Sequence, residues 1–235
     1  HDLGHTPFGH AGEKALNRIH HFSHQEQSVR VVEKLEKDGK GLNLTWEVRD
    51  GILNHQGDNL ASTLEGRIVK FADRIAYINH DIDDACRAGI LSEGDIPERL
   101  RKALGSDHSS RINTMVTSVV RYSEWLFDKE KPDIAMEPEI RAATDELRGF
   151  LFDRVYYSDT VRAEEKRAKG VVTMLFGHFT ARPEEMPELF VRMTNEEPVE
   201  RCVCDFISGM TDRHAIRLFS RLFIPNTWSE RGTYS

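Results

Sequence analysis

The first thirteen residues concentrate side chains that could bind a metal or transfer protons. His1 and Asp2 are adjacent, and an imidazole and a carboxylate can ligate one divalent cation together. His10 and Glu13 are three residues apart, so on one helical turn they share a face. A carboxylate beside an imidazole fixes its tautomer and raises its basicity, as a general acid or base requires.

The residues around these groups favour a functional interpretation. An isolated His-Asp pair is most often a solvated surface feature, but three histidines and two carboxylates set among glycines are much less common. We therefore favour a metal-binding or catalytic role for the segment. Three glycines are expected to let backbone segments approach closely: Gly4, Gly9 and Gly12.

These residues carry a family resemblance. The string HDLGHTPFGHAGE at residues 1–13 resembles the second metal-binding motif of the HD-domain phosphohydrolases, in the branch similar to deoxyguanosine triphosphate triphosphohydrolase. Further blocks follow in the family's order: FSHQEQS at 22–28, GILNH at 51–55, ADRIAYINHDIDD at 72–84, FLFDRVY at 150–156 and DFISGMTDR at 205–213. Blocks that extend from end to end are far more specific than a bare HD pair.

The resemblance implies a set of metal ligands. His1, Asp2 and Asp73 would bind a divalent cation, together with a histidine from a helix upstream of the HD pair. Nitrogen and oxygen ligands suit Mg, Mn, Fe, Co, Ni or Zn, and the sequence does not choose among them. The alternative for Asp73 is a salt bridge with Arg67 or Arg74.

The chain begins at the HD pair itself, so the upstream histidine is not part of it. We therefore expect an HD domain over residues 1–235 that is incomplete at its N-terminus. Such a piece on its own is expected to bind metal poorly, to hydrolyse substrate slowly or not at all, and to aggregate.

Tyr77 and Asp81 follow Asp73 at one-turn steps, so the three side chains should line one helix face. The resemblance implies that Tyr77 stacks on a furanose ring and that Asp81 contacts its 3′-hydroxyl. Such a pocket would have no room or partner for a 2′-hydroxyl. The alternative is a capping tyrosine and a solvated acid.

The resemblance also implies phosphate-binding residues. Arg74 matches a basic phosphate-binding position, and His24 matches a position close to the phosphates, although a helix-capping histidine is the alternative. His5 could orient phosphate oxygens or support the His10–Glu13 pair. Arg148 and Tyr156, two turns apart, are similar to an Arg and a Tyr that reach phosphate and base in the sterile-alpha-motif relative.

The reaction implied is metal-assisted hydrolysis of deoxynucleoside triphosphates (dNTPs), dGTP among them, to a deoxynucleoside and inorganic triphosphate. His10, oriented by Glu13, would protonate the leaving oxygen or assist the nucleophile. One alternative is another HD-domain phosphohydrolase, a nucleotidase or phosphodiesterase. The other is a regulator that binds dNTPs without turnover.

Composition narrows the choice of partners. A net charge of −7 argues against a protein that coats nucleic acid, which leaves nucleic acid at most a regulatory role. No apolar run approaches the ~20 residues of a membrane span. The three cysteines do not form a disulfide framework, so we expect a cytoplasmic protein. The resemblance implies a homo-oligomer.

Hydrophobic periodicity predicts an all-α protein without strand patterns. The resemblance implies that its helices form an HD-domain bundle. Gly89 is a plausible cap for the best-defined helix, and Pro183 and Pro187 mark a turn. That helix carries an apolar stripe of Ile68, Phe71, Ala72, Ile75, Ala76, Ile78 and Ile82. Helices are predicted at residues 26–37, 46–53, 64–88, 96–104, 112–127, 138–157, 162–179 and 200–222.

Overall fold

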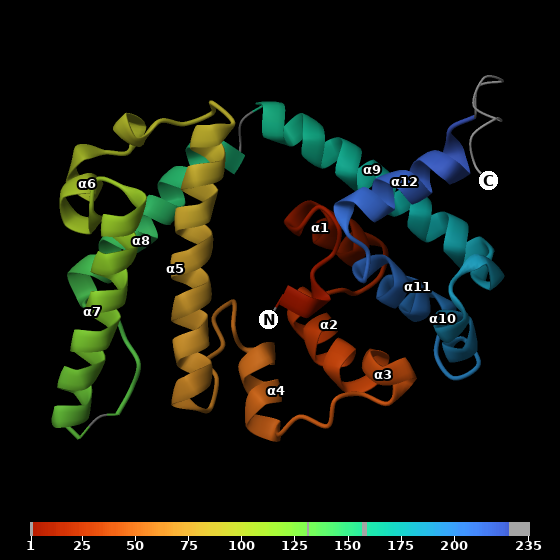
Figure 1. The fold of residues 1–235 in the computed structure, drawn as a ribbon, viewed down its shortest axis with the longest axis horizontal. Coiled ribbons are helices and arrows are strands. Elements are labelled where there is room, and N and C mark those ends of the chain that lie inside the picture. The colour runs from red at the N-terminus through yellow and green to blue at the C-terminus, as the bar shows by residue number, and fades with distance from the viewer. Residues whose placement is uncertain (1, 131, 157–158, 226–235) are drawn as a thin grey trace. The chain divides into compact units, whose positions relative to one another are not determined.

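A computed structural model describes residues 2–130, 132–156 and 159–225, drawn as a ribbon in Figure 1. Every regular element in these ranges is a helix or helical turn, and none is a β-strand. The predicted all-α class is confirmed. The chain separates into two compact units, each with its own hydrophobic core. Unit 1 comprises residues 1–44 and 163–235, and unit 2 comprises residues 45–162.

Unit 1 packs its helices around a core that includes Leu16, Phe22, Leu175, Phe179 and Ile207. These side chains come from segments far apart in the sequence, so the N-terminal motif is held by the C-terminal helices of its own unit. The elements are η1 (Asp2–Gly4), α1 (His10–Ile19), α2 (His24–Arg30), a π-helical turn η2 (Val31–Leu35), α3 (Glu36–Gly39), α9 (Asp159–Ala181, which enters unit 1 at residue 163), η5 (Pro183–Glu185), α10 (Glu188–Met193), α11 (Val199–Ser208) and α12 (Asp212–Phe223).

Unit 2 is built around the long helix α5, and its core includes Ile78, Ile82, Leu104, Met115 and Leu147. Side chains from α5, α6, α7 and α8 contribute to this core, which fixes the rotation of α5 about its axis. The elements are α4 (Trp46–Leu53), α5 (Leu64–Arg87), η3 (Glu93–Asp95), α6 (Glu98–Leu104), α7 (His108–Asp128), α8 (Pro138–Leu151) and a π-helical turn η4 (Phe152–Tyr156).

Local signals explain where α5 begins and ends. The Thr63 hydroxyl accepts a hydrogen bond from the Gly66 amide and satisfies one of the free donors of the first turn. The helix ends at Arg87, and Gly89 follows Ala88 at φ +68°, the left-handed conformation that glycine adopts without strain. Gly89 thus terminates α5 as predicted, one residue beyond the cap itself.

The predicted apolar stripe of α5 is only partly buried. Ile75, Ile78 and Ile82 are in the core of unit 2, but Ile68 is 50% exposed; Ala72 and Ala76 are also exposed. The apolar stripe of α5 therefore extends around more of the helix than the face that packs against the rest of unit 2. Asp73, between these faces, is half-buried.

A buried arginine ties α5 to α7 and η3. Arg111 is 1% exposed, and its guanidinium nitrogens lie 2.6 and 2.9 Å from the two carboxylate oxygens of Glu93. Its Nε also donates to Oδ1 of Asn79 on α5 at 3.1 Å. A buried charge is tolerated when it is paired and hydrogen-bonded in this way.

The structure corrects some predicted elements. The helix predicted at 200–222 is two helices, because the chain breaks at Gly209–Thr211 and the Thr211 hydroxyl caps α12 by accepting from the His214 amide. The helix predicted at 26–37 becomes π-helical at Val31, and α10 was not predicted. The break predicted near Ser158 lies outside the described residues.

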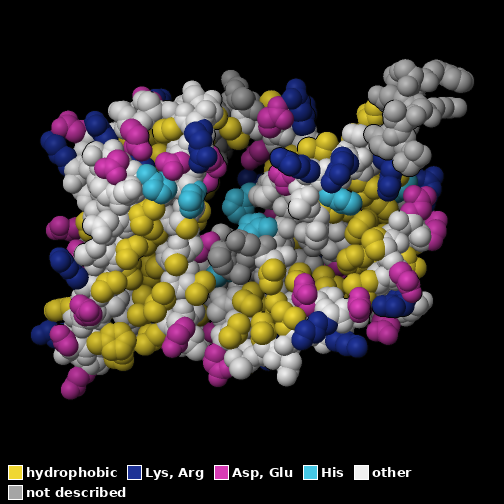
Figure 2. All heavy atoms as spheres, viewed as in Figure 1, with side chains coloured by type: hydrophobic (Ala, Val, Ile, Leu, Met, Phe, Trp, Pro, Cys, Tyr) yellow, Lys and Arg dark blue, Asp and Glu magenta, His cyan; other side chains and the backbone are white. Residues whose placement is uncertain are grey.

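Hydrophobic side chains also reach the surface of unit 2. Figure 2 shows hydrophobic side chains over the face formed by α5 and α7. Along these two helices, Ile68, Val116, Val120 and Trp125 are each exposed by 45% or more. No helix in the described part of the chain is both long and apolar enough to cross a membrane.

Candidate active site

The N-terminal motif folds into a cluster of three imidazoles around one carboxylate, all within unit 1. Glu13 is in the first turn of α1, and its two oxygens contact different histidines. Oε2 lies 3.3 Å from Nδ1 of His10, and Oε1 lies 2.9 Å from Nδ1 of His24. The His5 ring stacks on the His24 ring at a centroid distance of 4.2 Å. The structure thus brings together four of the predicted site residues.

The link between Glu13 and His24 extends beyond what the motif spacing predicted. His24 is the first residue of α2, and its backbone amide also donates to Oε1 of Glu13 at 2.9 Å. The residue that caps α2 is Ser23, whose hydroxyl accepts from the Glu26 amide. His24 therefore contributes an oriented ring, and the capping role belongs to its neighbour.

Burial differs sharply among these residues. The side chain of His24 is 2% exposed, that of Glu13 is 17% exposed and that of His10 is 63% exposed. His10 is therefore the imidazole of the pair that solvent or a ligand can reach. Glu13 contacts the His10 ring and orients it, while His24 holds the Glu13 carboxylate in place.

The environment keeps Glu13 ionised. Burial would raise the pKa of the Glu13 carboxyl, but hydrogen bonds from the rings of His10 and His24 and from the His24 amide together lower it well below its usual range. An ionised carboxylate in contact with an imidazole orients the ring and fixes which nitrogen faces it. The pair is thus suited to general acid–base chemistry.

The lowered pKa of Glu13 predicts a specific acid sensitivity. Because the folded-state pKa lies below the unfolded-state value, Glu13 contributes stability above about pH 4.3 that is progressively lost as the pH falls below it. We expect the free energy of unfolding of the Glu13→Gln variant, measured with urea, to fall less steeply below that pH than that of the wild type. Glu36→Gln, at an exposed position on α3, is the control and should retain the wild-type slope. Identical slopes in the wild type and Glu13→Gln would contradict this assignment.

Glycine permits two close approaches in this motif. A Cβ on Gly4 would lie 2.3 Å from the backbone nitrogen of Ser28, and one on Gly12 would lie 2.1 Å from the Pro7 carbonyl oxygen. The predicted close approach is therefore confirmed at these two positions. At Gly9 the prediction was wrong, because a Cβ there would meet nothing within 4 Å. Gly9 instead has φ +53° where the chain enters α1.

Residues of the 205–213 block contact the N-terminal motif and α2 within unit 1. The Phe8 amide donates to Oδ1 of Asp212 at 2.8 Å, which ties the loop before α1 to the start of α12. The buried Asp205 of α11 accepts hydrogen bonds at 2.8 Å from Gln27 and Arg30 of α2. Spacing alone could not predict these supports, because they join residues that are 175 to 204 positions apart.

The remaining predicted residues on α5 lie along one continuous helix in unit 2. Asp73, Tyr77 and Asp81 are each half-buried, as expected for side chains that face a partly open surface. Burial raises the pKa of the Tyr77 hydroxyl, while the nearby charges of Arg148 and Arg74 act in the opposite direction. Tyr77 therefore remains a neutral phenol with a hydrogen-bonding capacity.

The salt-bridge alternative for Asp73 involved two arginines that have other carboxylate partners. Nη1 of Arg67 lies 2.7 Å from Oδ1 of Asp133. Arg74 forms an ion pair with Asp145 of α8. These contacts favour a different role for the Asp73 carboxylate.

Arg148, predicted from a loose resemblance, lies beside Tyr77. The charged guanidinium of Arg148 lies close enough to the Tyr77 hydroxyl to lower its pKa, and it sits 5.2 Å from the ring centroid of Phe152. Tyr156 ends η4, and only its backbone is described. His55 is buried with Nδ1 2.6 Å from the Ile52 carbonyl oxygen, in keeping with a structural role.

The two predicted metal ligands at the N-terminus, His1 and Asp2, are described incompletely or not at all. His1 lies outside the described residues, and only the backbone of Asp2, in η1, is described. Among the described side chains, no three or more from His, Cys, Asp or Glu are arranged to hold a metal ion.

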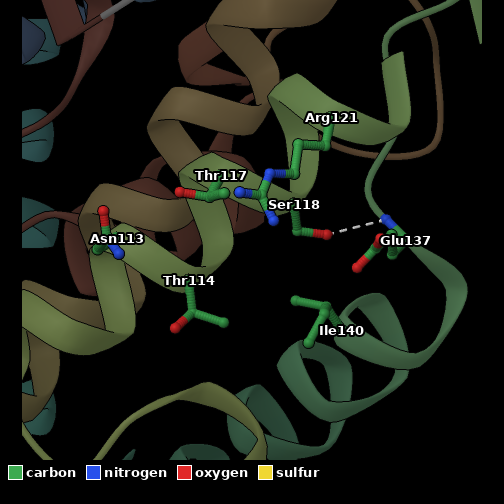
Figure 3. Close-up of a pocket in the computed structure, with 7 residues that line it drawn as sticks. All are labelled: Asn113, Thr114, Thr117, Ser118, Arg121, Glu137 and Ile140. Carbon is green, nitrogen blue, oxygen red and sulfur yellow. Dashed lines mark hydrogen bonds between the residues drawn. The ribbon is translucent and has the colours of Figure 1, made fainter. Parts of the chain in front are cut away.

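A shallow polar pocket of about 350 Å³ lies elsewhere in unit 2 (Figure 3). It is formed by α7, Glu137 and the first turn of α8, and Ser118 Oγ accepts from the Glu137 amide at 3.0 Å across its floor. None of the residues predicted to act in catalysis or binding lines it. Its other lining residues are Asn113, Thr114, Thr117, Arg121 and Ile140.

Comparison with known proteins identifies the family of the chain. Residues 1–78 match the HD domain, and residues 134–221 match the phosphohydrolase-associated domain. A deoxyguanosinetriphosphate triphosphohydrolase-like protein of Caldanaerobacter subterraneus is 49% identical over 236 residues, which cover 100% of this chain and 68% of the relative. The chain belongs to the deoxyguanosinetriphosphate triphosphohydrolase-like family. Proteins of the same name from Clostridium perfringens and Geobacter metallireducens are 46% and 34% identical, each over 96% of this chain and over 68% and 71% of their own lengths.

Membership of the deoxyguanosinetriphosphate triphosphohydrolase-like family confirms the predicted resemblance. The HD match contains the imidazole cluster of unit 1 and also Asp73, Arg74 and Tyr77 of α5. The second match contains Arg148, Asp205 and Asp212.

Proposed function

We propose that this protein hydrolyses deoxynucleoside triphosphates, dGTP among them, to a deoxynucleoside and inorganic triphosphate. The observation that carries the proposal is the carboxylate of Glu13 shared by His10 and His24. It pairs a solvent-accessible imidazole with an ionised orienting group, which is the arrangement that proton transfer to a leaving oxygen needs. The relatives' name supports dGTP as a substrate.

The reaction needs a divalent cation, and the available donors fit one. We propose His1, Asp2 and Asp73 as ligands, because an imidazole and two carboxylates form a mixed nitrogen and oxygen set. Asp73 is half-buried on α5, so its carboxylate can reach a bound ion without full desolvation. When bound, the cation would lower the pKa of a water molecule and offset negative charge on the phosphates. Mg, Mn, Fe, Co, Ni and Zn all suit this ligand set.

We assign proton transfer, phosphate binding and base recognition to side chains of this chain. His10 holds a proton with the help of Glu13 and gives it to the 5′-oxygen when the bond to the α-phosphorus breaks. His5 and His24, stacked on each other, orient phosphate oxygens. Arg74 and Arg148 neutralise phosphate charge, and Tyr156 reaches the base.

Tyr77 and Asp81 are proposed to select deoxyribose. Tyr77 is half-buried against the core of unit 2 and lies near the Arg148 charge, so its ring offers a surface for the furanose. A pocket closed at the 2′ position would bury an extra hydroxyl without a partner, at a cost of about 1–3 kcal/mol. We expect kcat/KM for dGTP to exceed that for GTP by roughly ten- to a hundredfold. Tyr77→Ala should reduce the ratio, whereas equal kcat/KM values in the wild type would contradict this role.

Two other functions predict different products. A nucleotidase or phosphodiesterase would release phosphate or a nucleoside monophosphate, and a regulator would bind dNTPs unchanged. Anion-exchange separation of the products formed from dGTP distinguishes the three. We expect deoxyguanosine and inorganic triphosphate in equal amounts, while dGMP with pyrophosphate would refute the proposed reaction.

We further propose a homo-oligomer in the cytoplasm. The exposed hydrophobic side chains over α5 and α7 form the kind of surface that commonly packs against another subunit. All three cysteines are free thiols, as in a reducing compartment. Light scattering during gel filtration should give a mass larger than the 27.0 kDa of one chain, and a monomer would exclude the assembly.

A further inference from the structure

Unit 2 carries more positive charge beside Tyr77 than the two predicted phosphate-binding arginines supply. On α5, Lys70 precedes Arg74 by one turn, and on α8, Arg141 precedes Asp145 by one turn. The two helices are linked by the Arg74–Asp145 ion pair, and the Arg148 charge on α8 lies close to the Tyr77 hydroxyl on α5. These contacts place successive turns of α5 beside successive turns of α8.

Four cations therefore share this region, and they are only partly compensated. Among the described residues, Asp145 is the one carboxylate that forms an ion pair with any of them, and its side chain is 51% exposed. The side chain of Arg141 makes no hydrogen bond or ion pair within the described part of the chain. Burial and the nearby charges of Arg74 and Arg141 lower the pKa of Lys70, with Asp58 acting in the opposite direction. Clustered like charges are unfavourable unless an anion joins them.

Lys70 is held in place and keeps a donor available. Its Nζ donates to the Gly57 and Asn59 carbonyl oxygens at 2.6 and 2.5 Å. An ammonium group has three N–H donors, so one remains for a further acceptor. The side chain is thus positioned before any ligand arrives.

Along α5, the proposed sugar-contacting residues are followed by the cationic residues toward the start of the helix. Asp81 and Tyr77 are proposed to contact the sugar, Arg74 is one turn closer to the start of the helix, and Lys70 is one turn closer still. We propose that Lys70 and Arg141 bind the phosphates of the triphosphate chain that lie farthest from the sugar, where they displace Asp145 from its pairing with Arg74. The inference rests on the proposed function and adds two binding residues and an internal counter-ion to it.

The test is calorimetric titration of the protein with inorganic tripolyphosphate in buffer free of divalent metal. We expect Arg141→Gln to weaken binding about tenfold, as for the loss of a charge-assisted hydrogen bond. Lys70→Gln should weaken it as well. Asp145→Asn should tighten it, by up to about fivefold, because an exposed ion pair opposes binding only weakly.

Two variants serve as matched controls. Arg87→Gln removes a positive charge from the exposed end of α5. Glu146→Gln neutralises the residue next to Asp145, and Glu146 pairs with Arg99, outside the cluster. Both should bind tripolyphosphate within about twofold of the wild type, because neither belongs to the cluster. Arg141→Gln binding as tightly as Arg87→Gln, or Asp145→Asn binding no more tightly than Glu146→Gln, would overturn the proposal. The titration contains no nucleoside and no metal, so its outcome is independent of whether dNTPs are hydrolysed.

Discussion

Replacing Asp73 with alanine is expected to abolish both metal binding and turnover. The proposed ligand set has few charged donors, and a methyl group in place of the carboxylate removes one of them without offering a substitute. The measurement is metal content by elemental analysis of the purified variant, together with triphosphate release from dGTP. Activity should fall to background, because the water to be activated would lose the cation's effect on its pKa.

Asp84→Ala is the control for this experiment. Asp84 lies on the same helix and pairs with Arg87 at the surface, with both side chains 73% exposed. The control should retain the wild-type metal content and rate, since an exposed ion pair of this kind contributes little to stability. Full metal occupancy in Asp73→Ala would rule out Asp73 as a ligand.

His10→Ala is expected to lower kcat by roughly 10²–10⁴, the range for one lost general acid–base group, while metal stays bound. The basis is the contact of His10 with Glu13 and its high exposure, which together describe a proton donor that a substrate can reach. The measurement combines steady-state kinetics with metal analysis. Metal lost along with activity would instead make His10 a ligand.

His21→Ala provides a matched control. His21 also contacts a glutamate, with Nε2 3.1 Å from Oε2 of Glu26, but its side chain is 79% exposed and lies outside the imidazole cluster. The variant therefore removes a His–Glu pair without touching Glu13 or His24. Its kcat should equal that of the wild type.

Periodicity predicted the helices well where one face is buried in a local core. The bounds of α4 match the prediction, and α5 differs from it by one residue, because Thr63 and Gly89 mark the ends of α5 chemically. Periodicity failed between α11 and α12. Apolar residues continue at helical spacing through Gly209 and Met210, and the break depends on the Thr211 cap, a local hydrogen bond that a pattern of apolar residues does not report.

The sequence predicted one contact at the candidate site and missed the others. Motif spacing identified His10 and Glu13 as a pair, and the structure confirms their contact. The second contact of Glu13, with His24, depends on how the turn between α1 and α2 folds back, which spacing does not determine. The pairing of Arg74 with Asp145 likewise joins two residues on different helices that are 71 positions apart in sequence. Such contacts follow from packing, so a single sequence without its fold gives no signal for them.

Triphosphate release from dGTP before and after removal of divalent metal is the most direct test of the proposed reaction. The full-length protein is treated with a chelator, dialysed and assayed with and without added Mn²⁺ or Mg²⁺, and both products are quantified by chromatography. We expect no product without metal, and with metal we expect deoxyguanosine and inorganic triphosphate in a one-to-one ratio. Metal-independent hydrolysis, or release of pyrophosphate with dGMP, would contradict the account.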